Sequence, residues 1–310
     1  MTTASLSPEA IASVGQRRRW RVLKDRGAAL VLGAAALSSI AITVGIVAVL
    51  VIDSAPFFVH VGFWTFLTDT IWTPLFPEPN FGILPLVAGT LVTTLVALAV
   101  AMPIGTVVAI YLSEFAPHWL REVLKPLLEL LSAVPTVVYG YFALLFVTPL
   151  LQAVYPDLPA FNMLGAGIVM GIMIIPYISS LSEDAMRAVP ALLREGSYAM
   201  GGNKLLTALK VVYPAALSGI GSSYVLGISR AVGETMIVAV AAGLQPNLTW
   251  NPAEPAATIT TFIVQVSLGE QPHGSIGYQS IFAAGAVLFA MTLVFNIAGY
   301  RLRKRFREAY

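Results

Sequence analysis

The sequence predicts an all-α integral membrane protein with six transmembrane helices. Of its 310 residues, 57% are hydrophobic and only 11% are charged, whereas a soluble domain carries about 25% charged residues. The apolar stretches are long and uniformly apolar, which favours helices over the alternating strands of a membrane barrel. Lysine and arginine gather in alternate loops between these stretches, as expected of a chain that crosses a membrane repeatedly.

Six segments have the length of about 20 mostly apolar residues that a helical crossing requires. They are Gly27–Ile52, Pro85–Leu112, Leu130 to Val154, Asn162 to Ser182, Pro214 to Gly243 and Gly277 to Tyr300. The first is longer than the apolar region of about 7–15 residues in a cleaved signal peptide, so we expect it to remain as a helix. Prolines inside the spans, such as Pro103, Pro135 and Pro176, are expected to kink them.

The basic residues orient these spans, because 17 of the 18 lie in four segments on one side. The segments hold Arg17, Arg18, Arg19, Arg21, Lys24 and Arg26; Arg121 and Lys125; Arg187, Arg194, Lys204 and Lys210; and Arg301, Arg303, Lys304, Arg305 and Arg307. The other three loops contain acidic residues but no lysine or arginine. The positive-inside rule therefore predicts a multi-pass protein of the cell (inner, cytoplasmic) membrane with both termini in the cytoplasm.

This topology divides the chain into five parts. We expect a cytoplasmic basic leader at 1–26, the first transmembrane helix at 27–52, an extracytoplasmic aromatic-rich loop at 53–84, a core of five transmembrane helices at 85–300 and a cytoplasmic basic tail at 301–310. The aromatic residues of the outer loop, including Phe57, Phe63, Phe66, Trp64 and Trp72, suit a belt at the membrane interface. The core includes a cytoplasmic loop at 183–213.

That cytoplasmic loop has apolar residues at helical spacing but lacks the length to span. It therefore predicts one or two short helices lying against the membrane face. Gly201 allows a bend between them, and Pro214 suits the first turn of the following helix, where a missing N–H costs nothing.

The same loop resembles the EAA loop of ABC importer permeases, which has Glu-Ala-Ala, then a Gly six positions after the Glu and a Pro thirteen after the Gly. Glu195, Gly201 and Pro214 fall on these positions, and Gly196 and Ser197 replace the two alanines. The resemblance implies a type I importer permease with a cytoplasmic coupling helix between spans four and five that docks on an ATPase. A generic amphipathic interfacial helix is the alternative.

The eighteenth basic residue, Arg230, lies with Glu234 in the fifth span, four positions apart and so on one face of a continuous helix. Each charge costs about 2.5–3.5 kcal/mol at the bilayer centre, so both should face the protein interior or a wet cavity. Either they form a structural ion pair, or Arg230 meets an anion and Glu234 orients it. Arginine suits a tetrahedral oxyanion because its planar fork offers paired donors. Ser229 and Thr235 flank this proposed gate.

Arg230-Ala231-Val232-Gly233-Glu234-Thr235-Met236 is similar to the motif of the permease subunits of phosphate ABC importers, more to the C-type (PstC-type) than to the A-type. Similar motifs of that subunit are Gly82-Ile83-Leu84-Pro85, Gly89-Thr90 and Glu129 to Gly140. The resemblance implies phosphate import with a second permease (PstA-like), an ATPase dimer (PstB-like) that binds ATP and Mg, and an extracytoplasmic phosphate-binding protein. The short outer loop Tyr155 to Phe161 departs from the pattern.

Other chemistry is disfavoured. The chain has no Gly-x-x-x-x-Gly-Lys-Ser/Thr loop, so if ATP drives this protein, another chain binds it. It has no cysteine and no catalytic triad spacing, its histidines His60, His118 and His273 are scattered, and its net charge of +2 does not suggest nucleic acid. Glu129, at the start of the third span, is expected to complement the positive end of that helix.

Three alternatives stay open: a permease for another oxyanion such as sulfate, molybdate or a phosphonate; an ion-driven secondary carrier; and a structural membrane subunit. Secondary carriers usually show repeated halves with broken helices, which the sequence does not reveal.

Overall fold

The computed structural model describes residues 8–269, 271–272 and 274–305. Over these residues the chain is helical, and the one pairing of extended backbone is an isolated antiparallel bridge between Trp72 and Phe81. The all-helical prediction is confirmed. The chain divides into two compact units, Met1–Ile52 and Asp53–Tyr310. Of the predicted features, the ends of the leader (1–7) and tail (306–310) and His273 lie outside the described residues.

The first unit is formed by the helix α1 (Pro8–His60), which continues into the second unit. The expected first span, Gly27–Ile52, lies within it, and the stretch Lys24–His60 is long and apolar enough to cross a membrane.

The second unit is built around α3 (Leu84–Ile110) and α7 (Met163–Arg187), which pack along each other. Small residues allow this close packing, because a Cβ at Gly167 or Gly171 of α7 would collide with Val96 or Val100 of α3. The buried core between them includes Ala97, Ala101, Ala166, Val169, Met170 and Ile174. Close contact through small side chains is the usual basis of helix packing in membranes.

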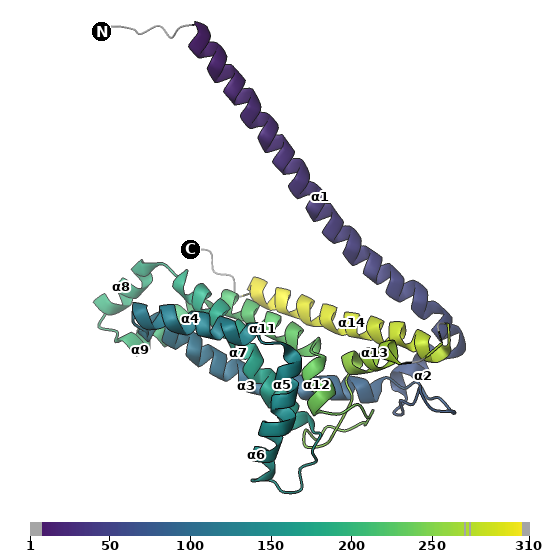
Figure 1. The fold of residues 1–310 in the computed structure, drawn as a ribbon. Helices are drawn as coiled ribbons and strands as arrows, with labels where there is room; N and C mark the ends of the chain where they lie inside the picture. The colour runs from purple at the N-terminus through teal and green to yellow at the C-terminus, as the bar shows by residue number, and fades with distance from the viewer. Residues whose placement is uncertain (1–7, 270, 273, 306–310) are drawn as a thin grey trace, which may run out of the picture. The chain divides into compact units, whose positions relative to one another are not determined.

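Other long helices pack on this pair (Figure 1). α11 (Leu217–Val232) packs on α7, where a Cβ at Gly227 would press on Ile178. α14 (Ile276–Arg305) packs on α11, and α13 (Ile259–Leu268) packs on α14. The remaining elements are α2 (Phe63–Thr68), α4 (His118–Ala133), α5 (Thr136–Phe142), α6 (Thr148–Gln152), α8 (Ala191–Ala199), α9 (Lys204–Thr207), α10 (Tyr213–Ala215) and α12 (Met236–Ala241), with the π-helical turns η1 (Tyr111–Phe115), η2 (Ala143–Val147) and η3 (Ala208–Val212).

Four helices in the described residues are continuous and apolar enough to span, and the number reaches six if each of two bent pairs counts as one span. The expected second, fourth and sixth spans correspond to Leu84–Phe115, Met163–Arg187 and Ile276–Arg301. Asn162 begins the fourth, because its side-chain oxygen accepts a hydrogen bond from Gly165 N at 2.6 Å.

The expected third span is not one helix. His118–Ala133 and Thr136–Gln152 meet at an angle of 89°, so α5 and α6 run across the direction of α3 and α7 (Figure 1). Val134 is extended (ψ 131°) because it precedes Pro135, and proline disfavours a helical residue before it. Glu129 consequently lies near the C-terminal end of α4, and its predicted role at a helix N-terminus is wrong.

The expected fifth span, Pro214 to Gly243, is also wrong as a single helix. Lys204–Ala215 and Leu217–Val232 bend by 72° at Ala216, and the chain breaks again between Val232 and Met236. Pro214 therefore ends the preceding helical run rather than opening the span. The sequence also did not indicate α13, whose 10 residues are too few for a crossing.

The aromatic residues of the outer loop are divided between core and surface. Phe63 and Trp64 are exposed, as a membrane belt requires, but Phe57, Phe66 and Trp72 are buried. Edge-to-face contacts join the buried rings, with Phe57 and Phe66 centroids 5.5 Å apart and Trp72 4.8 Å from Phe262 of α13. The belt prediction is therefore wrong for the residues that pack this loop onto the bundle.

Gly89 should be required for the packing of α3 against the segment before α13. A Cβ at Gly89 would collide with the carbonyl oxygen of Ala257, while the neighbouring Thr90 Oγ1 accepts from Ile259 N at 3.1 Å. We expect Gly89→Ala to lower the free energy of unfolding by about 1–3 kcal/mol, measured by denaturation in detergent. Gly233→Ala is the matched control, because its Cβ would approach Ser229 O only to 3.4 Å. Equal stability of the two variants would contradict this assignment.

Candidate functional site

The fifth span breaks at Gly233, Glu234 and Thr235, and Glu234 forms hydrogen bonds with backbone groups at the break. Its side chain is buried, and Oε1 accepts from Met236 N at 3.1 Å and Ile237 N at 3.4 Å. Thr260 Oγ1 donates to the Glu234 carbonyl oxygen at 2.8 Å. A helix leaves its first N–H groups free, and the Glu234 carboxylate accepts hydrogen bonds from two of those of α12. Thr260 of α13 donates to the backbone carbonyl group at the break.

The break separates the two predicted gate charges. Arg230 lies in the last turn of α11 and Glu234 lies beyond that helix, so they do not share a helix face, and no ion pair joins them. The structural ion pair expected as one alternative is therefore wrong. Instead, each charge lies at the helix end of opposite polarity: the cation at the C-terminus of α11 and the anion at the N-terminus of α12.

Arg230 keeps unused hydrogen-bond donors. Its guanidinium carbon lies 5.0 Å from the centre of the Tyr177 ring and its Nη2 lies 4.0 Å from the Met173 sulfur, both on α7. Its Nε is buried without a hydrogen-bond partner. A buried donor without a partner is costly, and an anion would supply one. The aromatic face stabilises the cation without occupying its N–H groups.

The other predicted gate residues are satisfied locally. Ser229 Oγ donates to Val225 O at 2.9 Å on its own helix, and Thr235 Oγ1 donates to Gly233 O at 3.4 Å. Gly233 is exposed and its small size is not required by neighbouring atoms. The backbone at Gly233 therefore lies at the surface of the described chain.

The predicted coupling loop forms a helical hairpin at one end of the bundle. Gly201 takes φ +84°, which favours glycine, and turns the chain from α8 toward α9. Ser197 Oγ lies 2.7 Å from Thr207 Oγ1 and so joins the two helices. Asn203 Oδ1 accepts from Leu206 N at 2.8 Å and begins α9. The bend expected at Gly201 is present.

The hairpin has an exposed apolar side. Leu192 and Met200 are 77% and 89% exposed, and Tyr198 and Glu195 are also exposed. A Cβ added at Gly196 would have no neighbouring atom within 4 Å. Apolar side chains at this exposure are typical of a surface that a partner covers.

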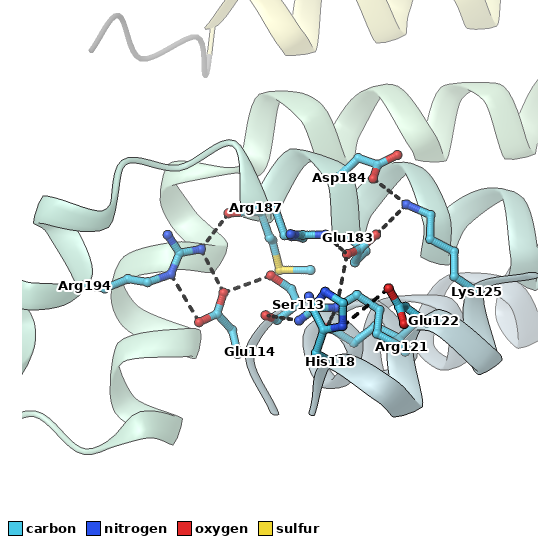
Figure 2. Close-up of polar contacts among 12 residues, drawn as sticks. Ser113, Glu114, His118, Arg121, Glu122, Lys125, Glu183, Asp184, Arg187 and Arg194 are labelled. Atoms are coloured by element: carbon cyan, nitrogen blue, oxygen red, sulfur yellow. Dashed lines mark hydrogen bonds and ion pairs between the residues drawn. The ribbon is translucent and has the colours of Figure 1, made fainter. Parts of the chain in front are cut away.

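Figure 2 shows a cluster of ion pairs next to this hairpin that the sequence analysis missed. Glu183 of α7 is fully buried and faces three cations: Lys125 at 2.8 Å, Arg187 at 3.5 Å and Arg121 at 3.7 Å. A buried carboxylate requires such partners. In the sequence, these basic residues indicated only the orientation of the spans. The spacing of Glu183 and Arg187, four positions apart in a helix, is the pattern that could have indicated an ion pair.

A second pair in Figure 2 joins α8 to η1, the turn that follows α3. Arg194 Nη2 lies 2.9 Å from Glu114 Oε1, and Nε lies 3.3 Å from Oε2. Within the described residues no group of three or more His, Cys, Asp or Glu side chains could hold a metal. Of the histidines there, His118 pairs with Glu122 and the His60 ring contacts the Pro56 carbonyl.

Comparison with known proteins shows the family to which the chain belongs. Residues 101–308, more than half of its length, match the family described as binding-protein-dependent transport system inner membrane component. The chain belongs to this family. It is therefore a transport permease subunit of a membrane.

The matches between this permease and its named relatives extend over most of the length of both proteins. The probable ABC transporter permease protein YqgH of Bacillus subtilis (strain 168) is 36% identical over 230 residues, 74% of each chain. The phosphate transport system permease protein PstC of Pasteurella multocida is 32% identical over 252 residues, 74% of this chain and 77% of that protein. PstC 1 of Mycobacterium tuberculosis is 32% identical over 264 residues, 78% of this chain and 77% of that protein.

Solved permeases share the fold. A bacterial ABC transporter involved in the import of the acidic polysaccharide alginate gives a TM-score of 0.62 at 17% identity, covering 93% of this chain and 100% of that one. The MetNI methionine ABC transporter in an inward-facing form gives 0.54 at 18% identity, covering 73% and 94%. These likenesses establish the ABC importer permease fold.

Family membership decides between the classes of transporter that the sequence left open. Broken helices were expected of a secondary carrier, yet this permease has breaks at Val134–Pro135 and at Gly233–Thr235. The absence of visible breaks in the sequence was thus a poor criterion. The family and the fold support an importer permease over a carrier.

The break should depend on the Glu234 carboxylate. Glu234→Ala leaves the Met236 and Ile237 N–H groups without their acceptor and should lower the free energy of unfolding by about 1–2 kcal/mol. Glu234→Gln retains an acceptor oxygen and should cost less. Denaturation of the permease in detergent gives the comparison, and an Ala variant as stable as wild type would refute the capping role.

Proposed function

We propose that this chain is the permease subunit through which an ATP-driven importer moves inorganic phosphate into the cytoplasm. The observation that carries the proposal is the Arg230 guanidinium, held beside the helix break with its Nε unpaired. Relatives that are 32% identical over 74% and 78% of this chain are named phosphate transport system permease proteins, and the resemblance of the Arg230–Met236 motif supports the same substrate.

The geometry favours an anion as the species that passes Arg230. The guanidinium is fixed by the Tyr177 ring and the Met173 sulfur, and neither contact neutralises its charge. The nearest acid in the sequence, Glu234, already accepts two backbone N–H groups. A phosphate could therefore take the free donors of Arg230 in a charge-assisted contact.

Coupling to ATP requires a separate ATPase, which we propose docks on the α8–α9 hairpin. The exposed Leu192, Tyr198 and Met200 would enter a groove of that ATPase, and the exposed Glu195 would pair with a basic residue there. ATP and Mg would bind the ATPase dimer. With this hairpin in the cytoplasm, both termini are cytoplasmic, in agreement with the positive-inside rule.

An extracytoplasmic binding protein would deliver the anion. The loops on the opposite side carry Asp53, Asp69, Asp157 and Glu254 without any lysine or arginine, which repels free phosphate. Hydrogen bonds from the side chains of Thr249, Asn251 and Asn247 lower the pKa of Glu254. A second permease subunit would complete the pathway, as the resemblance to phosphate importer permeases implies.

A permease for sulfate, molybdate or a phosphonate is the second candidate, because a single arginine accepts any tetrahedral oxyanion. The relatives favour phosphate. Competition of each unlabelled oxyanion with labelled phosphate, in vesicles that hold the assembled complex with and without ATP, distinguishes them. Inhibition by phosphate alone supports the proposal, and stronger inhibition by another oxyanion replaces it.

Removal of the guanidinium should stop transport. Arg230→Ala loses the donors and should reduce ATP-dependent phosphate uptake by about 100-fold or more, which corresponds to the loss of one charge-assisted contact of about 2.7 kcal/mol. Arg230→Lys keeps the charge without the planar fork and should retain partial activity. Arg301→Ala, an exposed arginine, is the control. Wild-type uptake by a correctly assembled Arg230→Ala complex would exclude the pathway role.

The turn at Gly201 should be required for coupling. Gly201→Val places a β-branched side chain at φ +84°, at a cost of about 1–2 kcal/mol, and should misplace α8. We expect phosphate uptake to fall more than ATP hydrolysis. Gly196→Ala lies in a helix with open space around it and should behave as wild type. Both rates are measured in the same proteoliposomes; unchanged uptake in Gly201→Val would argue against this docking site.

A further inference from the structure

Arg194 and Glu195 are neighbours on α8 but have opposite surroundings. Glu195 is exposed, whereas the Arg194 side chain is 19% exposed and turns toward the bundle. Besides Glu114, it donates to Val189 O at 2.7 Å and to Met186 O at 2.8 Å, at the end of α7. One guanidinium therefore joins α8 to α7 and to η1 (Figure 2).

Glu114 is equally well held on its side. Its side chain is 6% exposed, and Oε1 also accepts from Ser113 Oγ at 2.9 Å. Arg121 of α4 donates to Leu112 O at 2.9 Å, and the Lys204 ammonium of α9 lies 5.4 Å from the centre of the Phe115 ring. Both halves of the hairpin therefore contact η1, the last turn of the second span.

The turn η1 is π-helical, and it continues directly from α3, the helix that packs along α7 in the core. Single π-helical turns are rare and are frequent at functional sites. α8 also contacts a second such turn, η3, which leads into the fifth span. The hairpin is thus attached to the two places where the adjoining helices depart from α-helical geometry.

Within the described residues, Arg194 is the α8 side chain that bonds to the spanning helices; Ser197, the other bonded one, contacts Thr207 inside the hairpin. A bidentate pair between planar groups fixes orientation as well as distance. Leu193 of α8 also packs against the buried cluster that contains Ala109 of α3 and Met186 of α7, so a motion of α8 would reach α3 through the Arg194–Glu114 pair together with this apolar contact.

We propose that Arg194 and Glu114 are positioning residues that make α8 and η1 move as one body, so that the ATPase stroke reaches the second span. The inference rests on the proposed function, because it assumes that an ATPase moves α8. It assigns the two residues a role in energy coupling, separate from docking and from the anion path.

Phosphate uptake and ATP hydrolysis are measured together in proteoliposomes that hold the full importer and its binding protein. Glu114→Gln and Arg194→Met should leave ATP hydrolysis measurable while uptake per ATP falls about 5-fold or more, the scale of a typical coupling energy. Glu122→Gln removes an exposed acid of α4 and is the control. Normal uptake per ATP in both variants would overturn the proposal.

A cross-link separates coupling from misfolding. The chain has no cysteine, so Glu114→Cys with Arg194→Cys gives a unique pair that a bifunctional thiol reagent can join. The uncross-linked double variant should be uncoupled, and the cross-link should restore uptake per ATP because α8 and η1 move together. Loss of the remaining uptake on cross-linking would show that the two segments separate during the cycle and would overturn the proposal.

Wild-type vesicles in the same experiment distinguish this inference from the proposed function. If wild type moves no phosphate, the proposed substrate is wrong, and the coupling role is then decided by stimulation of ATP hydrolysis by the binding protein, which Glu114→Gln should reduce. If wild type moves phosphate and the variants match it in both readouts, the coupling role alone is wrong.

Discussion

A helix inside a bilayer cannot end unless its free backbone groups find partners within the protein, and this constraint explains the architecture around Glu234. The fifth span stops at Val232 and resumes at Met236, and the carboxylate of Glu234 with the hydroxyl of Thr260 satisfies the exposed ends. Thr260 belongs to α13, so this short helix is needed at the break. Because Glu234 is committed to the backbone, Arg230 is left with free donors.

Charged residues therefore have different roles at the helix break and next to the α8–α9 hairpin. Beside the break, Arg230 is unpaired and positioned by the Tyr177 ring, which suits a transient anion. Next to the hairpin, acids and bases form ion pairs: Glu183 faces three cations, and Glu114 is held by Arg194. Paired and desolvated charges give rigid connections, whereas an unpaired one gives a site.

The helical class, the place of the α8–α9 hairpin along the chain and the bend at Gly201 could be predicted, because hydropathy and the need for glycine at a turn are local properties. The breaks could not, since membrane helices accept Gly and Pro both in kinks and in continuous runs. The four-residue spacing of Arg230 and Glu234 was misleading for that reason. The Glu114–Arg194 pair joins residues 80 positions apart, and burial of Trp72 depends on α13; neither follows from a sequence window.

The central claim is that the fifth span is open at Gly233 and Thr235 and that an anion approaches there. Single cysteines in this cysteine-free chain test it: Gly233→Cys, Thr235→Cys and, as the buried comparison, Val238→Cys. The Val238 side chain is 1% exposed. In the assembled importer, a small charged thiol reagent should modify positions 233 and 235 much faster than 238, and phosphate with the binding protein should slow the reaction at both. Equal, slow modification at all three positions would contradict the account.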